Sequence, residues 1–203
     1  MFRKMIFALF VTMTSVVANA TDYHSLKRDN EEMIKLQTQD RDDVMNDELA
    51  WDQFTENRLR RRQKVIELLS KNQLETAYDY WRAALIFQHG DSAEDYRLAH
   101  SFATIAYTLK QDEQISWLVA ASWDRMMNAM GKAQWYGTQY LPDKEGRIAT
   151  LLDIDKSVSD EERERLIHMK LTAIPLTIPA NKKPGQPNLP PGYFSKRYVR
   201  DEQ

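Results

Sequence analysis

The sequence TAYDYWRAALIFQHG, residues 76–90, decides the fold of this chain. Thr76 and Asp79 form a capping-box pattern, in which two side chains satisfy backbone N–H groups at the start of a helix. Apolar residues fill most positions from there to Gln88, and Gly90 is expected to supply the C-terminal stop. Because so little of this helix is polar, we predict that it is the central and most buried helix of the molecule.

Further helices are predicted on both sides of this segment, so the fold class is mainly α, a compact bundle of antiparallel helices. Apolar residues recur at helical spacing, and capping residues or glycines mark most of the helix ends. The helix pair at about residues 93–130 resembles a tetratricopeptide-like hairpin, although no second copy follows at a fixed period. The other predicted helices lie within residues 22–48, at 56–71 and at 159–169.

The predicted helix at 56–71 combines an apolar face with a strong basic run. Leu59, Ile66 and Leu69 share one side of this helix, with Val65 and Leu68 beside them, and this side is expected to face the core. The basic run RLRRRQK at 58–64 is expected to be a solvated helix face that answers the acidic segment before it. The alternative is a surface that binds an anionic ligand or a membrane.

After Gly131 the pattern changes from helical to extended. Two apolar segments flank the loop PDKEG, which predicts a β-hairpin at about residues 136–152. Six of the seven prolines follow between Ile174 and Gly192, where they exclude a helix and predict an extended tail. The predicted organisation is a signal peptide at 1–20, a polar acidic helical segment at 21–54, a helical core domain with the hairpin at 55–170, and a Pro-rich tail at 171–203.

Residues 1–20 have the pattern of a cleavable signal peptide. Arg3 and Lys4 precede a mostly apolar run, and the segment ends in Ala18-Asn19-Ala20. The apolar run is shorter than the roughly 20 residues that a membrane-spanning helix needs. We therefore expect cleavage after Ala20, export to the periplasm or the medium of a bacterium, and no membrane span in the mature protein.

The composition restricts the partners of the exported chain. It has no cysteine, so a packed core rather than disulfide bonds must stabilise it. Once Arg3 and Lys4 are removed, acidic residues outnumber basic ones by a small margin, which argues against a nucleic-acid partner. The expected partner is an unknown protein or a small-molecule ligand of the cell envelope.

Connectivity brings polar side chains from several segments to one end of the predicted helical body, because consecutive antiparallel helices place their ends side by side. These side chains form either a buried hydrogen-bonded network or the lining of a ligand pocket. Histidine is the usual general acid or base near neutral pH, so His89 and His100, with Asp124, are the candidate catalytic residues. The full set of candidate binding residues is Gln88, His89, Tyr96, His100, Asp124, Arg125, Gln134, Tyr136, Thr138 and Gln139.

Several short motifs in this region resemble a bacterial family that is catalogued only as a domain of unknown function. The most specific is Gly131-x-x-Gln134-x-Tyr136-Gly137-Thr138-Gln139, and the resemblance covers roughly residues 55–165. The other motifs are Gln88-His89-Gly90, Asp95-Tyr96, Ala99-His100, Trp117-Leu118 and Asp124-Arg125. The resemblance implies a mostly helical, bacterial and often exported protein, and it carries over no catalytic residue.

Two functions follow from these observations. The first is an exported binding or interaction module of the cell envelope, with the polar residues as structural core or ligand pocket. The alternative is an envelope hydrolase that uses His89 or His100 with Asp124. No cofactor is expected, and no metal, because His89, Asp91, His100 and Asp124 follow no ligand spacing of a known metal motif.

Overall fold

The computed structural model describes residues 27–46, 48–143 and 148–179. The predicted signal peptide, Leu26 and most of the predicted tail lie outside the described residues. The helices are α2 (Glu31–Met45), α3 (Trp51–Ser70), α4 (Ala77–Gln88), α5 (Ala93–Leu109), α6 (Glu113–Ala129), α7 (Asp160–Ile167) and the short 3-10 helix η1 (Leu171–Ala173). The strands are β1 (Tyr140–Pro142), β2 (Ile148–Leu151) and β3 (Thr177–Pro179). The mainly helical fold class is thus confirmed.

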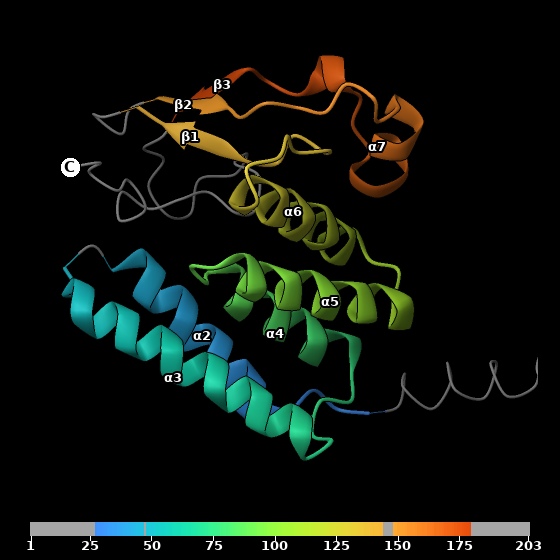
Figure 1. Ribbon diagram of the computed structural model, residues 1–203. Helices are drawn as coiled ribbons and strands as arrows, with labels where there is room; N and C mark the ends of the chain where they lie inside the picture. The colour runs from blue at the N-terminus through green and yellow to red at the C-terminus, as the bar shows by residue number, and fades with distance from the viewer. Residues whose placement is uncertain (1–26, 47, 144–147, 180–203) are drawn as a thin grey trace, which may run out of the picture.

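Helix α4 lies at the centre of the molecule, as predicted. It contacts α2, α3, α5 and α6, and from bottom to top Figure 1 shows α2 and α3, then α4 and α5, then α6, and then the sheet with α7. The capping box is present, because Thr76 accepts the backbone N–H of Asp79 while Asp79 accepts that of Thr76. Ile86 and Phe87 are buried in the main apolar cluster together with Val65 of α3 and Phe102 of α5.

Helices α5 and α6 form the predicted antiparallel hairpin. Ser92 and Asp95 make a second capping box at the start of α5, and the side chain of Asp112 caps α6. The two helices are in extensive contact, and several of their buried residues are alanines, namely Ala99, Ala103 and Ala106 of α5 and Ala120 and Ala121 of α6. Such small side chains allow the two helix backbones to approach closely.

The strands form a three-stranded antiparallel sheet in the order β1-β2-β3. The hairpin predicted at 136–152 is present as β1 and β2, with Tyr140 opposite Leu151. The third strand, β3, lies in the segment predicted to be an extended tail, and its Ile178 pairs with Ala149. Strand β3 ends at Pro179, which has no backbone N–H to donate. An edge strand tolerates this proline, because one side of the strand pairs with no other strand of the sheet.

The prediction for the buried face of α3 is wrong for two of its residues, although Val65 and Leu68 are buried and Leu69 packs against the main apolar cluster. Leu59 is 48% exposed and Ile66 is 41% exposed. The buried stripe instead follows a repeat of four and three residues along the helix, and arginines occupy several of its positions. Its members are Phe54, Arg58, Arg61, Arg62, Val65 and Leu68. The basic run is therefore in large part buried, not solvated, because acidic side chains of α2 and of the α4–α5 turn neutralise it.

Gly90 follows α4 for a reason other than the one predicted. A left-handed C-terminal cap would require positive φ, but the described glycines with positive φ are Gly131 and Gly137. Gly90 is needed because a Cβ there would lie 2.2 Å from the Cβ of Asp95. The turn between α4 and α5 can be this tight only with glycine at that position. Gly131, with φ +69°, does end α6 in the left-handed conformation.

None of the helices in the described part of the chain is both long and apolar enough to cross a membrane.

Candidate functional site

Asp124 is the anchor of the predicted polar cluster. It lies in the last turns of α6, is 0% exposed, and faces the segment that leads from α6 to β1. Its Oδ1 accepts the backbone N–H of Trp135 at 2.7 Å and that of Tyr136 at 3.0 Å. Its Oδ2 accepts the N–H of Thr138 at 3.0 Å and the Thr138 hydroxyl at 2.9 Å. One carboxylate thus binds the backbone N–H groups of three residues of the loop.

Burial of Asp124 and its hydrogen bonds act on its charge in opposite directions. Burial raises the pKa of the Asp124 carboxyl above its ordinary value, while the donors of Tyr136, Thr138 and Trp135 lower it in part. Every donor around the carboxylate belongs to the loop that it fixes. A group bound in this way is unsuited to exchange protons with a substrate, because its oxygens are occupied and away from solvent.

Gln134 and Gln139 close the same loop on itself. The backbone N–H of Gln139 donates to Oε1 of Gln134 at 2.8 Å, and Nε2 of Gln134 donates to the carbonyl of Gln139 at 3.0 Å. Nε2 of Gln134 also donates to the carbonyl of Leu152 at 2.9 Å, which ties the loop to the end of β2. Both glutamines are at most 2% exposed. The Gln134 side chain is therefore structural, since it replaces a backbone partner that the irregular loop lacks. The Gln139 side chain instead donates to the carbonyl of Ala121 and to the hydroxyl of Thr138.

Tyr136 belongs to the loop through its backbone and to α7 through its side chain. Its hydroxyl donates to Oε1 of Glu162 at 3.3 Å, and its ring contacts Trp135. Burial raises the pKa of Tyr136 to about 12. At neutral pH the phenol is thus protonated and joins α7 to the loop.

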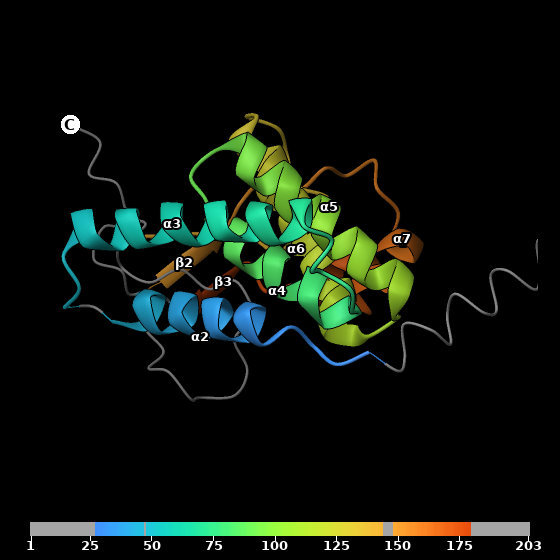
Figure 2. The same ribbon diagram turned by 90° about the horizontal axis from the view of Figure 1, so that it is seen from below.

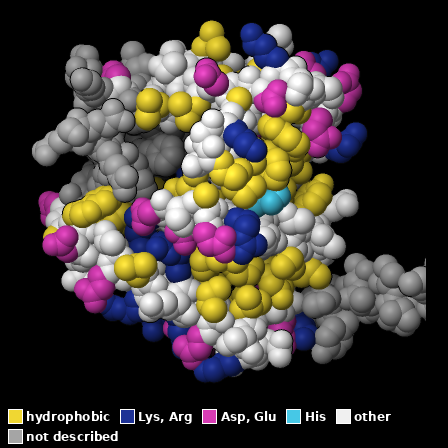
Figure 3. Space-filling view, in the orientation of Figure 1, with side chains coloured by type: hydrophobic (Ala, Val, Ile, Leu, Met, Phe, Trp, Pro, Cys, Tyr) yellow, Lys and Arg dark blue, Asp and Glu magenta, His cyan; other side chains and the backbone are white. Residues whose placement is uncertain are grey.

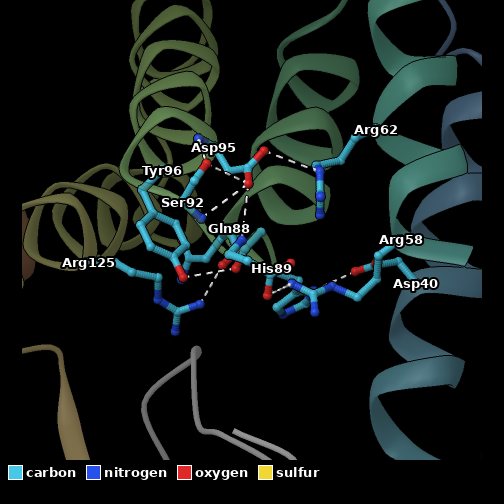
Figure 4. A network of polar contacts seen from close by, with 11 residues as sticks. Asp40, Arg58, Arg62, Gln88, His89, Ser92, Asp95, Tyr96 and Arg125 are labelled. Atoms are coloured by element: carbon cyan, nitrogen blue, oxygen red, sulfur yellow. Dashed lines mark hydrogen bonds and ion pairs between the residues drawn. The ribbon is translucent and has the colours of Figure 1, made fainter. Parts of the chain in front are cut away.

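Arg125 connects this loop to the turn between α4 and α5. Its Nη1 donates to the carbonyl of Gln88 at 2.5 Å and its Nε to Oε1 of Gln139 at 3.1 Å. The guanidinium lies 5.8 Å from the ring centroid of Tyr96, whose hydroxyl donates to the carbonyl of Gly90 at 2.9 Å. Figure 4 shows Tyr96 and Arg125 together on one side of the α4–α5 turn.

The two candidate histidines lie away from Asp124, and within the described residues neither has a hydrogen bond to it. Nδ1 of His89 lies 2.5 Å from Oδ2 of Asp40, which belongs to α2. Nδ1 of His100 lies 3.1 Å from the carbonyl of Val119, and because a carbonyl only accepts, this nitrogen carries the proton. The His–Asp pair considered for hydrolysis therefore does not form with Asp124.

His100 is part of an aromatic row on α5, α6 and the following loop. Its ring lies 5.3 Å from that of Trp123, which lies 4.7 Å from that of Trp135. Burial lowers the pKa of His100 below its ordinary value, and its bond to the carbonyl of Val119 offsets part of that decrease. Apolar side chains and a histidine share the face of α5 and α6 that is seen in Figure 3.

A cleft of about 350 Å³ opens beside the polar network, between the start of α5, the end of α6 and β1. Tyr96, Arg125 and Gln139 of the predicted set line it. Its apolar walls come from Ala93, Ala129, Tyr140, Leu141 and Leu152. Asn128 also lines the cleft, and its buried Nδ2 has no hydrogen-bond partner in the described part of the chain. The cleft thus combines apolar walls with a few polar groups, which is the usual form of a small-molecule site.

Acidic and basic side chains also form a cluster between α3 and the α4–α5 turn, which the sequence did not predict. Arg58 donates to Asp91 at 3.0 Å, and Arg62 lies 3.2 Å from Asp95. Figure 4 shows these two arginines reaching the turn from α3, on the side opposite Tyr96 and Arg125. The signal in the sequence was the basic run itself, but its acidic partners are far away along the chain.

Potential metal ligands are scattered. His89, His100 and Asp124 each have separate partners, and the described residues contain no group of three or more such side chains that could hold a metal ion. Comparisons of the chain with family models, curated proteins and solved structures find no match. The resemblance to an uncharacterised bacterial family therefore stays a prediction.

Proposed function

We propose that this protein is an exported binding module of the bacterial cell envelope that takes a small organic ligand in the cleft between α5, α6 and β1. The observation that carries the proposal is the lining of this cleft. Apolar walls surround the buried guanidinium of Arg125 and the amide of Asn128. The volume of about 350 Å³ lies at the lower end of the range for ligand sites, roughly 300–1,000 Å³.

Asp91 also lines the cleft, but its carboxylate is paired with Arg58. The donors of Arg125 and Asn128 favour a ligand with a carboxylate or another flat acceptor group. An arginine guanidinium presents donors in a planar fork that fits a carboxylate. Arg125 is held in place by Gln88 and Gln139, so the guanidinium is oriented before a ligand arrives. The Nδ2 group of Asn128 supplies a further donor. The ring of Tyr96 and the side chain of Leu141 would cover an aromatic or aliphatic body.

Benzoate and phenylacetate are suitable probes, because each joins a flat apolar body to a carboxylate. We expect each to raise the melting temperature of the wild-type protein in a dose-dependent manner, since a ligand that binds the native state stabilises it. The variant Ala129→Trp fills the cleft from the exposed end of α6 and should abolish the shift. Ile105→Trp is the control, because Ile105 lies on the surface of α5, outside the cleft lining. The proposal fails if no probe shifts the wild type, or if Ala129→Trp responds as the control does.

A hydrolase is the second candidate, and one observation bears on it. His89 has a carboxylate partner after all, Asp40 at 2.5 Å, which is the arrangement that orients a histidine as a base. Asp40 also accepts from Arg61. The test is hydrolysis of p-nitrophenyl acetate by wild type and by His89→Gln. A rate above the uncatalysed one that is lost in the variant supports a hydrolase, and equal rates remove this candidate.

A further inference from the structure

The groove between α2 and α3 gathers positive charge on two facing helices. Figure 2 shows these helices side by side, and a hollow of about 400 Å³ lies between them. Lys35 of α2 lines it together with Arg60, Arg61 and Lys64 of α3. Lys64 lies three and four positions after Arg61 and Arg60, so the three side chains share one side of α3.

The floor of the groove is a fixed arginine. Arg61 is 5% exposed, and its Nε and Nη1 donate to Asp40 and Asp43 at 3.2 and 2.7 Å. Asp43 accepts a second bond, from Nδ2 of Asn57 at 2.9 Å. The negative charge of Asp43 is therefore neutralised within the protein. The remaining nitrogen of the guanidinium, Nη2 of Arg61, is buried without a hydrogen-bond partner among the described residues. An unmade bond of a buried charged donor is costly, which makes this nitrogen a feature that a ligand would satisfy.

The cationic side chains at the mouth of the groove are free enough to turn toward a ligand. Lys35 is exposed and has no ion-pair partner in the described part of the chain. Arg60 pairs with Glu56, but both side chains are more than 60% exposed, and such pairs contribute little. Lys64 pairs with Glu67 on its own helix at 3.0 Å.

The charge balance of the lining favours an anion. Four cations and two carboxylates, Glu32 and Asp43, line the groove, and Asp43 is already paired with Arg61. Several cations around a narrow groove raise the local concentration of an anion. A phosphate group has enough acceptor oxygens to bind two or more of these side chains at once.

We propose that the α2–α3 groove is a second binding site, for a ligand that carries a phosphate group. Lys35, Arg60 and Lys64 bind the phosphate oxygens. Arg61 lines the groove beneath them with its charge compensated by Asp40 and Asp43, and it offers only its unpartnered Nη2 donor. The site is separate from the cleft beside Arg125, and it stands or falls independently of the proposed function. A free phosphate compound and the headgroup of an anionic phospholipid offer the same chemistry, so both sources are tested.

The test is titration of the full chain with inorganic pyrophosphate by calorimetry, and sedimentation with vesicles of phosphatidylglycerol or of phosphatidylcholine alone. The variant Lys35→Ala/Arg60→Ala removes two exposed cations of the groove. We expect a loss of affinity of at least about tenfold, because each removed charge-assisted hydrogen bond weakens binding by roughly that factor. The matched control, Arg41→Ala/Lys71→Ala, removes the same charge from positions on α2 and just after α3 that do not line the groove.

Two results support the proposal and distinguish the ligand sources. Saturable binding of pyrophosphate that is lost in the groove variant and kept in the control indicates a free phosphate ligand. The same pattern with phosphatidylglycerol vesicles alone indicates a lipid headgroup. The proposal is overturned if the wild type binds neither probe, or if the control loses as much affinity as the groove variant. Circular dichroism confirms that both variants are folded.

Discussion

Replacing Asp124 with asparagine tests whether this carboxylate holds the loop before β1 in place. Oδ1 accepts the N–H of Trp135, Oδ2 accepts that of Thr138, and both accept that of Tyr136. An asparagine side chain has one oxygen and one NH₂ group. Whichever way the amide turns, the backbone N–H of either Trp135 or Thr138 loses its acceptor and faces another donor.

The size of the effect follows from this arrangement. A buried donor left without an acceptor costs about 1–3 kcal/mol, so Asp124→Asn should lower the free energy of unfolding by that amount. Asp124→Ala removes both oxygens and strands all three N–H groups, at about 3–9 kcal/mol. A domain of this kind has a total stability of about 5–15 kcal/mol, so we expect the alanine variant to lose a large part of it.

The assay is urea unfolding followed by tryptophan fluorescence, because Trp135 belongs to the loop and its ring contacts that of Trp123. Asp153→Asn is the control, since Asp153 is exposed and its substitution should change the free energy by less than about 0.5 kcal/mol. If Asp124→Asn unfolds at the same urea concentration as the wild type, the carboxylate does not anchor the loop.

Two further predictions concern the same region. Gly137→Ala should lose about 2–5 kcal/mol of stability, because φ is +76° and a Cβ would lie 2.7 Å from Cδ1 of Ile174. Gly131→Ala, with φ +69° and open space, should lose only the backbone part, about 1–2 kcal/mol, and equal losses in urea unfolding would contradict this account. The pKa of His100 is lower in the folded protein than in the unfolded chain, so protonation favours unfolding, and stability should fall as the pH drops below about 6.5. His100→Gln should flatten this dependence, and an unchanged slope between neutral and mildly acidic pH would refute it.

The sequence predicted the elements whose signals are local. The capping boxes at Thr76 and Ser92 each involve residues three positions apart, so the starts of α4 and α5 could be read directly. The apolar character of α4 likewise indicated its central position. Motifs that are contained within one turn of helix do not depend on the rest of the fold.

The burial of arginines on α3 could not be predicted, although the acidic segment before the helix was expected to answer the basic run and does pair with Arg61. Arginine is rarely buried unless it is paired, so a run of arginines indicates a surface. Here Arg61 is paired with Asp40 of α2, and Arg62 with Asp95 of α5. Only the packed structure brings these charges together. The same reason explains why the alternative hydrolase hypothesis named Asp124, and not Asp40, as a partner for His89.

The composition of the candidate site was predicted better than its geometry. Asp124 and Gln134 do meet, but they serve the loop, and the cleft is lined by Tyr96, Arg125 and Gln139. Connectivity gave the end of the helix bundle at which polar groups gather. It did not give side-chain direction, which depends on the irregular path of the loop.

Amide chemical-shift mapping with phenylacetate is the most direct test of the central claim, that a ligand cleft lies beside a structural polar network. The wild-type protein is titrated and followed by two-dimensional NMR. The account predicts saturable shifts at the cleft residues, with Tyr96, Asn128 and Leu141 among the largest. Shifts confined to the α2–α3 groove, or no saturable shift at these three amides, would contradict it.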